Sequence, residues 1–327
     1  MRSGGARAIA LCAGAWLAIG AEPLVAAQSA PGQPLTVMSF NLRYGTANDG
    51  ENHWTRRRAF LIDVVREADA DVIGVQEALS GQIQELLEAL PAYAAVGVGR
   101  DDGRTRGEYA AILYRRTRFR VADSGTFWLS DTPDVIGSTS WGNTITRICT
   151  WARFIDRDGR AFWHFNVHLD HQSQPSRERS AALLAERVRA RRHIDEPALV
   201  TGDFNAGETN PAVTLLTRGA SGAAPLLVDS FRVRHPDERT VGTFTGFKLD
   251  ATTGEKIDYV LVPPGTSVLD AAIVRTSREG RYPSDHFPVT ARVILGRGRP
   301  PQVSPLGSVD SVSARGPRRA HSSCRYR

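Results

Sequence analysis

Short apolar runs alternate with longer amphipathic segments along most of the chain. Five of the runs carry an acidic, amide or imidazole side chain at or near one end, and they span residues 37–41, 72–77, 199–205, 257–262 and 284–289. Runs of this length that are rich in β-branched residues predict buried β-strands. Three further segments predict strands at residues 109–114, 147–155 and 161–168.

Helical periodicity separates these predicted strands. Phe60, Val64 and Ala68 belong to an apolar stripe that predicts a helix over residues 55–68, with Thr55 as its N-cap. Further helices are predicted at residues 81–90, at the Arg-rich segment 177–193 and at residues 211–218. Strands interleaved with helices on one chain indicate the α/β class.

The two ends of the chain differ from the middle. Residues 1–27 combine Arg2 and Arg7 with an apolar stretch and the sequence Val25-Ala26-Ala27, which predicts a cleavable secretory signal. Residues 28–34 predict a linker, and the Arg-, Pro- and Ser-rich residues 296–327 predict a disordered tail. We therefore expect one folded domain over residues 35–295, in a protein that is exported to the periplasm or secreted.

The basic character of the chain comes from its ends. The net charge of +6 includes +1 from residues 1–27 and +6 from residues 296–327, which leaves −1 for residues 28–295. A nearly neutral domain lacks the overall positive charge typical of DNA-binding domains, although a local basic groove is compatible with it. We expect the tail to contact polyanions peripherally and the protein to be a monomer.

The polar groups of the five runs share one chemistry. They are carboxylates, amides and an imidazole, with no cysteine among them. Polar groups at strand ends can converge at one edge of a sheet, and such a set suits a hard cation such as Mg²⁺. This combination predicts metal-assisted hydrolysis of a phosphoester.

The order and spacing of the runs resemble the endonuclease/exonuclease/phosphatase superfamily, which includes DNase I, AP endonucleases, nocturnin-like deadenylases and sphingomyelinases. The resemblance covers about residues 35–295. It implies a four-layer α/β/β/α sandwich, in which two packed mixed β-sheets are flanked by helices. It also implies a hydrolase that depends on Mg²⁺, with Mn²⁺ as an alternative.

The resemblance implies a metal site and a nucleophile-activating group. Asn41 in Ser39-Phe40-Asn41, Glu77 in Gln76-Glu77 and Asp285 in Ser284-Asp285-His286 are the expected metal-shell residues. Asp203, in Gly202-Asp203-Phe204-Asn205, is expected to orient or deprotonate the attacking water. Asn205, one residue beyond Phe204, is expected to point to the same side as Asp203 and to support the metal or the transition state.

Two histidines complete the expected catalytic set. His286 is expected to contact the phosphoryl group, with Asp258 as the carboxylate that orients it. His168 matches the second catalytic histidine of the family, and Glu108 is expected to pair with it.

Substrate contacts are expected mainly from loops, where selection usually resides. Arg147 is expected to hold phosphate, and His171, Arg100 and Trp128 are expected to line the pocket. Each of the last three could instead be a packing residue or a loop staple.

These residues together predict a phosphodiesterase, either a nuclease or an enzyme for a small-molecule or phospholipid head-group diester. A phosphomonoesterase of a sugar, inositol or nucleotide phosphate is the alternative. Outside the enzymes, the alternative is a non-catalytic module that binds a phosphorylated ligand or a protein. Acidic loop residues and the net charge of −1 suit a compact polar substrate at least as well as DNA.

Overall fold

The computed structural model describes residues 32–219, 224–249 and 252–296. The predicted signal peptide, residues 28–31 of the predicted linker, and the predicted tail apart from Gly296 lie outside the described residues. None of the described helices has both the length and the apolar composition needed to cross a membrane.

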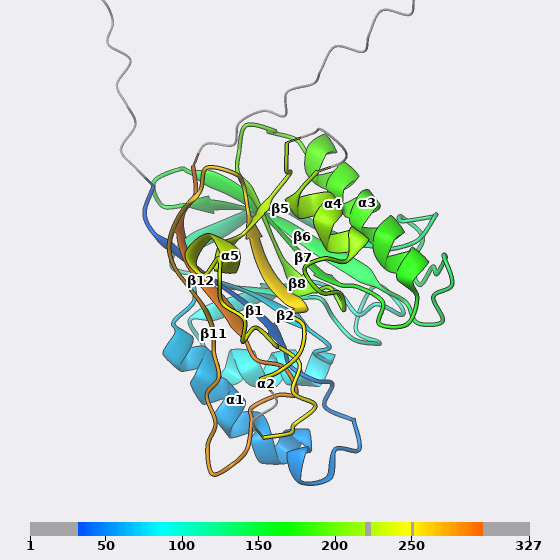
Figure 1. The fold of residues 1–327 in the computed structure, drawn as a ribbon, viewed down its shortest axis with the longest axis vertical. Coiled ribbons are helices and arrows are strands. Elements are labelled where there is room, and N and C mark those ends of the chain that lie inside the picture. The colour runs from blue at the N-terminus through cyan, green and yellow to red at the C-terminus, as the bar shows by residue number, and fades with distance from the viewer. Residues whose placement is uncertain (1–31, 220–223, 250–251, 297–327) are drawn as a thin grey trace, which may run out of the picture. The chain divides into compact units, whose positions relative to one another are not determined.

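The described strands form two six-stranded mixed sheets (Figure 1). The first sheet has the order β11-β12-β1-β2-β4-β3, and the second has the order β5-β6-β7-β8-β10-β9. The strands are β1 (Leu35–Asn41), β2 (Val72–Gln76), β3 (Tyr93–Val96), β4 (Ile112–Arg115), β5 (Phe119–Trp128), β6 (Ile148–Asp156), β7 (Ala161–His168), β8 (Ala198–Asp203), β9 (Val228–Asp229), β10 (Asp258–Val262), β11 (Ser267–Ile273) and β12 (Val289–Ile294).

Helices cover the outer face of each sheet, as Figure 1 shows. Helices α1 (Trp54–Ala68) and α2 (Ser80–Ala89) share one apolar core with the first sheet, and α3 (Gln174–Ala190) and α4 (Pro211–Thr217) share another with the second. A third core lies between the two sheets. Two short elements complete the fold, η1 (Gly50–Asn52) and α5 (Ser230–Arg234). The predicted four-layer α/β/β/α sandwich is confirmed.

Strand alternation separates the inner and outer faces of each sheet. In β1, Val37 belongs to the core between the sheets and Met38 to the core under α1. In β8, Leu199 belongs to the inner core and Val200 to the core under α3. Because side chains alternate along a strand, Asn41 and Asp203 therefore also face the space between the sheets.

The fifth apolar run is not a strand along its length, so that prediction is wrong. β12 begins only at Val289, and Asp285 and His286 lie in the preceding loop. Pro288 has no N–H to donate, which explains why regular pairing does not extend through it. His286 nevertheless forms one isolated bridge with Phe244.

Several element boundaries also differ from the prediction. α3 begins at Gln174 because the Ser173 hydroxyl caps it by accepting from the Ser176 N–H, and it ends at Ala190. The N-cap of α1 is His53 rather than Thr55, and its ring accepts from the Thr55 N–H. The predicted strand at residues 109–114 is regular only from Ile112. β3, β5, β9, β11 and α5 were not predicted.

Candidate active site

The two sheets bring their polar strand ends to the same place. β1 and β2 run parallel and end at Asn41 and next to Glu77, while β7 and β8 run parallel and end at His168 and Asp203. β10 runs antiparallel to β8, so its first residue, Asp258, lies directly beside Asp203. The site is therefore formed between two facing sheets rather than at the edge of one.

Asp203 lies at the centre of this group and is almost fully buried. Its Oδ2 accepts a hydrogen bond from Asn41 Nδ2 at 2.9 Å. The same oxygen lies 3.5 Å from His168 Nε2 and 3.7 Å from His286 Nε2. Its Oδ1 accepts from the Asn205 N–H at 2.8 Å. One carboxylate oxygen thus faces two imidazoles and an amide.

Burial and charge separate the protonation states of these groups. Burial, together with the negative charge of Asp258, raises the pKa of Asp203 to about 7. Burial and the positive charges of Arg147 and Arg100 hold the pKa of His168 well below its usual range, so this imidazole is neutral. Against the effect of burial, the carboxylates of Asp258 and Asp203 hold the pKa of His286 well above its usual range, so this imidazole is protonated.

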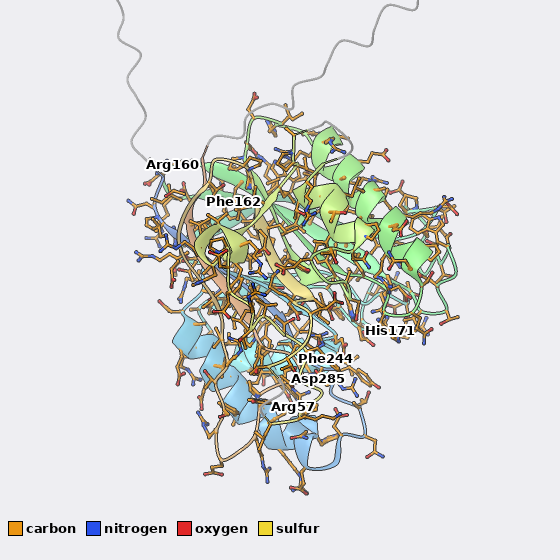
Figure 2. The ribbon with its side chains drawn as sticks, in the orientation of Figure 1. Arg57, Arg160, Phe162, His171, Phe244 and Asp285 are labelled. Carbon is orange, nitrogen blue, oxygen red and sulfur yellow. The ribbon has the colours of Figure 1, made fainter. Side chains whose placement is uncertain are left out.

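The expected contact between Asp258 and His286 is present. His286 Nδ1 donates to Asp258 Oδ2 at 2.9 Å, and the carboxylate is fully buried. This bond fixes the ring so that Nε2 faces Asp203. The half-exposed ring of Phe244 stands edge-on to the His286 ring, with centroids 5.0 Å apart. Figure 2 shows Phe244 and Asp285 close together at this end of the sandwich.

Glu108 lies near His168 but bonds to a different partner. Its carboxylate accepts two hydrogen bonds from the Arg100 guanidinium, at 2.6 and 2.8 Å, and is 4.0 Å from His168 Nδ1. Burial raises the pKa of Glu108 to about 7. Trp128 is buried, and its indole N–H donates to the Arg100 carbonyl at 2.7 Å. Trp128 therefore holds the Arg100 loop, whereas the expectation placed it in the pocket lining.

A second guanidinium, that of Arg147, also lowers the pKa of His168. Arg147 is buried, with Nε 3.4 Å from Asp170 Oδ2, and its Nη2 donates to His171 Nδ1 at 2.8 Å. Because arginine only donates, His171 must carry its proton on Nε2. His171 is exposed to solvent. Arg147 and Arg100 thus supply the positive charge near His168.

The expected metal-shell residues lie beside this cluster. Glu77 Oε1 accepts from Asn41 Nδ2 at 3.1 Å, and Glu77 Oε2 accepts from the Tyr44 N–H at 3.2 Å. Burial and the negative charge of Glu77 raise the pKa of Asp285. The carboxylates of Glu77 and Asp285 are oxygen donors that fit a hard divalent cation. The Asn41 amide turns its N–H groups to Glu77 and Asp203, while its Oδ1 accepts from the Arg43 N–H at 3.0 Å.

A second set of groups could also hold a cation. Asp203, Asp258 and His286 each place one ligand atom within 4.8 Å of the others. Asp258 Oδ1 accepts no hydrogen bond from the described residues. However, His286 Nδ1 is already bonded to Asp258, whereas the group at Glu77 offers carboxylate oxygens alone, the ligands that Mg²⁺ prefers. We therefore favour the group at Glu77 over this one as the metal site.

Strained backbone marks the same region. Glu77 has φ +61° and Asn205 has φ +46°, both in the left-handed region. Since β8 ends at Asp203, strand alternation does not apply to Asn205, and the same-side expectation for it stays a prediction. The Asn205 amide donates to the Leu169 carbonyl at 3.0 Å, while its N–H bonds Asp203.

Two arginines near the site were missed from the sequence. The buried Arg57 donates to the carbonyls of Leu42, Arg43 and Pro283, and so ties the segment after Asn41 to the segment before Asp285. The Nε of Arg43 lies 3.7 Å from Asp285 Oδ2. A signal for Arg57 existed, because it falls on the apolar face of the predicted helix, three residues after Trp54.

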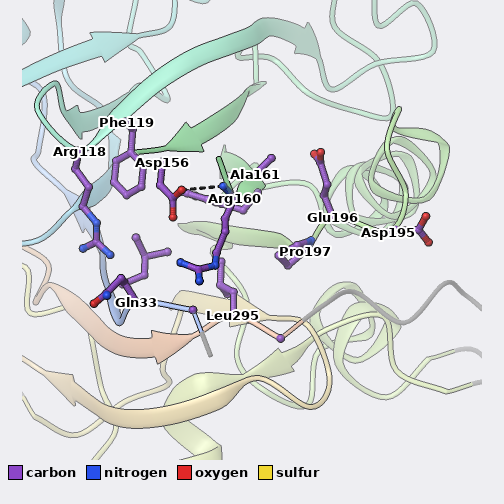
Figure 3. Close-up of a pocket in the computed structure, with 14 residues that line it drawn as sticks. Gln33, Arg118, Phe119, Asp156, Arg160, Ala161, Asp195, Glu196, Pro197 and Leu295 are labelled. Carbon is purple, nitrogen blue, oxygen red and sulfur yellow. Dashed lines mark hydrogen bonds between the residues drawn. The ribbon is translucent and has the colours of Figure 1, made fainter. Parts of the chain in front are cut away.

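A cavity at the opposite end of the sandwich contains none of these residues. It is lined by Arg118, Phe119 and Leu295 among others, and the Arg160 N–H donates to Asp156 there at 2.8 Å (Figure 3). Figure 2 shows Arg160 and Phe162 at this end and His171, Asp285 and Arg57 at the other. The candidate active site is thus distinct from this cavity.

Solved structures similar to the chain include two from Bacteroides thetaiotaomicron. An endonuclease/exonuclease/phosphatase family protein shares 34% identity over 81% of this chain and 99% of its own, with a TM-score of 0.73. A mannosyl-6-phosphatase shares 35% identity over 80% of this chain and 100% of its own, with a TM-score of 0.71. The human nocturnin catalytic domain, at 18% identity over 80% of this chain and 93% of its own and a TM-score of 0.62, shares the fold.

No curated protein matches the chain. The model of the endonuclease/exonuclease/phosphatase family matches residues 38–286, which begin in β1 and end at His286. This match includes Asn41, Glu77, Asp203 and Asp258 as well as the loops between them. The chain therefore belongs to the endonuclease/exonuclease/phosphatase family.

Proposed function

We propose that this protein is an exported, divalent-metal-dependent phosphoesterase, and that its substrate is a compact phosphomonoester such as a sugar phosphate. The observation that carries the hydrolase assignment is the meeting of Asn41, His168 and His286 at one oxygen of Asp203. Export rests on the N-terminal sequence pattern, and a monomer remains the expected state.

Asp203 is the general base in this proposal. A base works best when its pKa is close to the working pH, and the pKa of Asp203 is about 7. The Asn41 amide holds its Oδ2, and the Asn205 N–H holds its Oδ1. The carboxylate is therefore fixed in one orientation, from which it takes a proton from the water that attacks phosphorus.

The two imidazoles act in different charge states. Protonated His286 donates from Nε2 to a phosphoryl oxygen, and Asp258 stabilises its positive charge as negative charge grows on that oxygen. Neutral His168 contributes a hydrogen bond without a full charge. Arg147 and Arg100 supply the remaining positive charge around the phosphoryl group.

A divalent cation held by Glu77 and Asp285, with Asn41 beside them, would neutralise negative charge on the phosphoryl and leaving-group oxygens. Mg²⁺ is the proposed ion and Mn²⁺ the alternative, because the donors are oxygen atoms. Without such a cation, burial and the negative charge of Glu77 both raise the pKa of Asp285.

The monoester is favoured over the diester for two reasons. The similar Bacteroides thetaiotaomicron structure that carries a substrate name is a mannosyl-6-phosphatase, and all of that chain is covered. A terminal phosphate also carries more negative charge than a diester, which suits a pocket that contains Arg147, Arg100 and protonated His286. The diester that the sequence favoured, in a nucleic acid or a head group, is the competing substrate.

The test is a substrate panel with protein that begins at residue 28. Mannose 6-phosphate, glucose 6-phosphate, bis-p-nitrophenyl phosphate, phosphatidylcholine and plasmid DNA are each incubated with Mg²⁺ and with EDTA. We expect Mg²⁺-dependent phosphate release from the sugar phosphates, at least about tenfold faster than turnover of any diester. Faster hydrolysis of a diester would reject the monoester proposal, and turnover of none of them would leave a non-catalytic binding module as the better interpretation.

A further inference from the structure

A layer of polar side chains lies between the two sheets, directly beneath the active site. Ser39, Gln76, Asn166 and Thr201 are all fully buried, and each lies one or two residues before a site residue in the sequence. The inner positions further along the strands are apolar, such as Val37 and Leu199. Along the strands, the face between the two sheets is therefore first apolar, then polar, and then forms the active site.

Asn166 is the centre of this layer. Its Oδ1 accepts from Gln76 Nε2 at 2.7 Å and from the Thr201 hydroxyl at 2.9 Å. Its Nδ2 donates to the carbonyls of Val75 and Ala111, both at 2.9 Å. The amide thus uses both of its donors and accepts two bonds. Three of these four bonds cross from the second sheet to the first.

The directions of the neighbouring bonds are fixed as well. Because the Thr201 hydroxyl donates to Asn166, it must accept from His164 Nε2, which lies 2.7 Å away. Burial lowers the pKa of His164 to about 3, so this ring is neutral and carries its proton on Nε2. The bonds around Asn166 therefore have one consistent set of directions, while Gln76 Oε1 and His164 Nδ1 accept no hydrogen bond from the described residues.

The sheets approach each other closely at this point. A Cβ atom on Gly74 of β2 would lie 2.0 Å from Thr201 Oγ1 and 2.5 Å from Asn166 Oδ1. The layer therefore has no room for any side chain at Gly74, and its hydrogen bonds set the separation of β2 from β7 and β8.

We infer that Asn166 is a positioning residue, which sets the distance between the half of the active site on the first sheet and the half on the second. Asn41 and Glu77 belong to the first sheet, while His168 and Asp203 belong to the second. The hydrogen bond of 2.9 Å between Asn41 and Asp203 joins the two halves and depends on that distance. The positioning role itself does not depend on the proposed function. Only its expected effect on kcat rests on that proposal.

Substrate binding should be less affected than the reacting groups. Arg147 lies directly before β6 and moves with the second sheet, together with Asp203 and His168, whereas Arg100 lies between β3 and β4 and moves with the first. A change in the separation of the sheets moves Asn41 and Glu77 relative to Asp203 and His168 but leaves Arg147 in place beside them. It should therefore lower kcat more than it raises KM.

Three variants test this inference. Asn166→Leu removes all four bonds with little change in volume, and Gln76→Leu removes one cross-sheet bond and is the milder change. Val200→Ala is the control, because Val200 is fully buried on the outer face of β8 under α3. Each variant is measured by kcat, KM and thermal melting, and by a crystal structure that reports the distance from Asn41 Nδ2 to Asp203 Oδ2.

A displacement of about 1 Å at a reacting centre can cost about 10²-fold in rate. We expect kcat to fall by about 10–10²-fold in Asn166→Leu and less in Gln76→Leu, with KM within about threefold. We expect the Asn41–Asp203 distance to exceed hydrogen-bonding range in Asn166→Leu and to increase in Gln76→Leu. Val200→Ala should lower the melting temperature but leave kcat and this distance unchanged.

The inference is overturned if both Leu variants keep the 2.9 Å distance, or if their kcat falls no further than that of Val200→Ala. If Asn166→Leu does not fold, Gln76→Leu decides by the same two measurements. If the wild-type protein hydrolyses none of the phosphoesters, the proposed function has failed, and the distance alone decides the positioning role.

Discussion

Replacing Asp258 with Asn should remove most of the turnover while leaving the fold intact. The change keeps the shape of the side chain but removes the charge that holds His286 protonated. At 2.9 Å and an effective dielectric constant of about 20, that charge interacts with the imidazolium by about 6 kcal/mol, so its removal should strongly lower the pKa of His286.

We expect kcat to fall by about 10²–10³-fold, as for the loss of one preorganised donor, with a much smaller change in KM. The pH profile should move as well. Loss of the Asp258 charge lowers the pKa of Asp203 and of His286, so both limbs of the kcat/KM profile should move to lower pH. The assay is phosphate release from the best substrate between pH 5 and 10.

Asp71→Asn is the matched control. Asp71 is also a buried carboxylate, which accepts from the Thr36 N–H at 2.8 Å, but it lies at the other end of β2 from Glu77. The control should lose stability without losing turnover. A full rate and an unshifted pH profile in Asp258→Asn would refute the role of His286 as a charged donor.

The other predictions are as follows. Glu77→Gln should raise the Mg²⁺ concentration required for half-maximal rate by at least about tenfold, and metal binding measured by calorimetry should weaken in parallel; undiminished hydrolysis after exhaustive EDTA treatment would contradict the metal site. In the wild-type protein, kcat/KM should rise with pH through about 7, because Asp203 acts only when deprotonated; a flat profile between pH 5 and 8 would contradict it as the base. Gly74→Ala should cost about 1–3 kcal/mol of unfolding free energy in denaturant titration, because its Cβ would meet Thr201. Deleting residues 297–327 should leave the melting temperature and small-substrate turnover unchanged and weaken retention on polyanions at low salt; a lower melting temperature would show that this segment packs on the domain.

The sequence pattern predicted the α/β class and most of the chemistry, and the resemblance to the family predicted the four layers. The runs that contain Asn41, Glu77, Asp203 and Asp258 are continuous and β-branched, and burial in a four-layer fold requires that composition. The carboxylates at the ends of these runs indicate a functional site, because a buried strand has few other reasons to end in a carboxylate. α1 was predictable for the same reason, since its apolar stripe has a helical period that no neighbouring segment shares.

The weakest predictions concern segments whose form depends on distant contacts. Asp285 and His286 were placed on a strand because the residues around them are apolar, yet they lie in a loop held by bonds to the segment 243–246. The roles of Trp128 and Arg100 could not be separated, because the sequence does not show that an indole N–H meets the Arg100 carbonyl. Such contacts are set by the approach of loops far apart in the chain.

The sequence by itself determined which residues have inward positions near the strand ends, because side chains alternate with a period of two. Only the tertiary structure decided that these positions face each other across two sheets and that Asn166 connects them. It also decided that Asp203 lies near two imidazoles, one neutral and one protonated. The physical reason is that alternation is a property of one strand, whereas sheet separation and pKa values depend on what packs against that strand. The same carboxylate on an exposed strand would have an ordinary pKa and no catalytic partner.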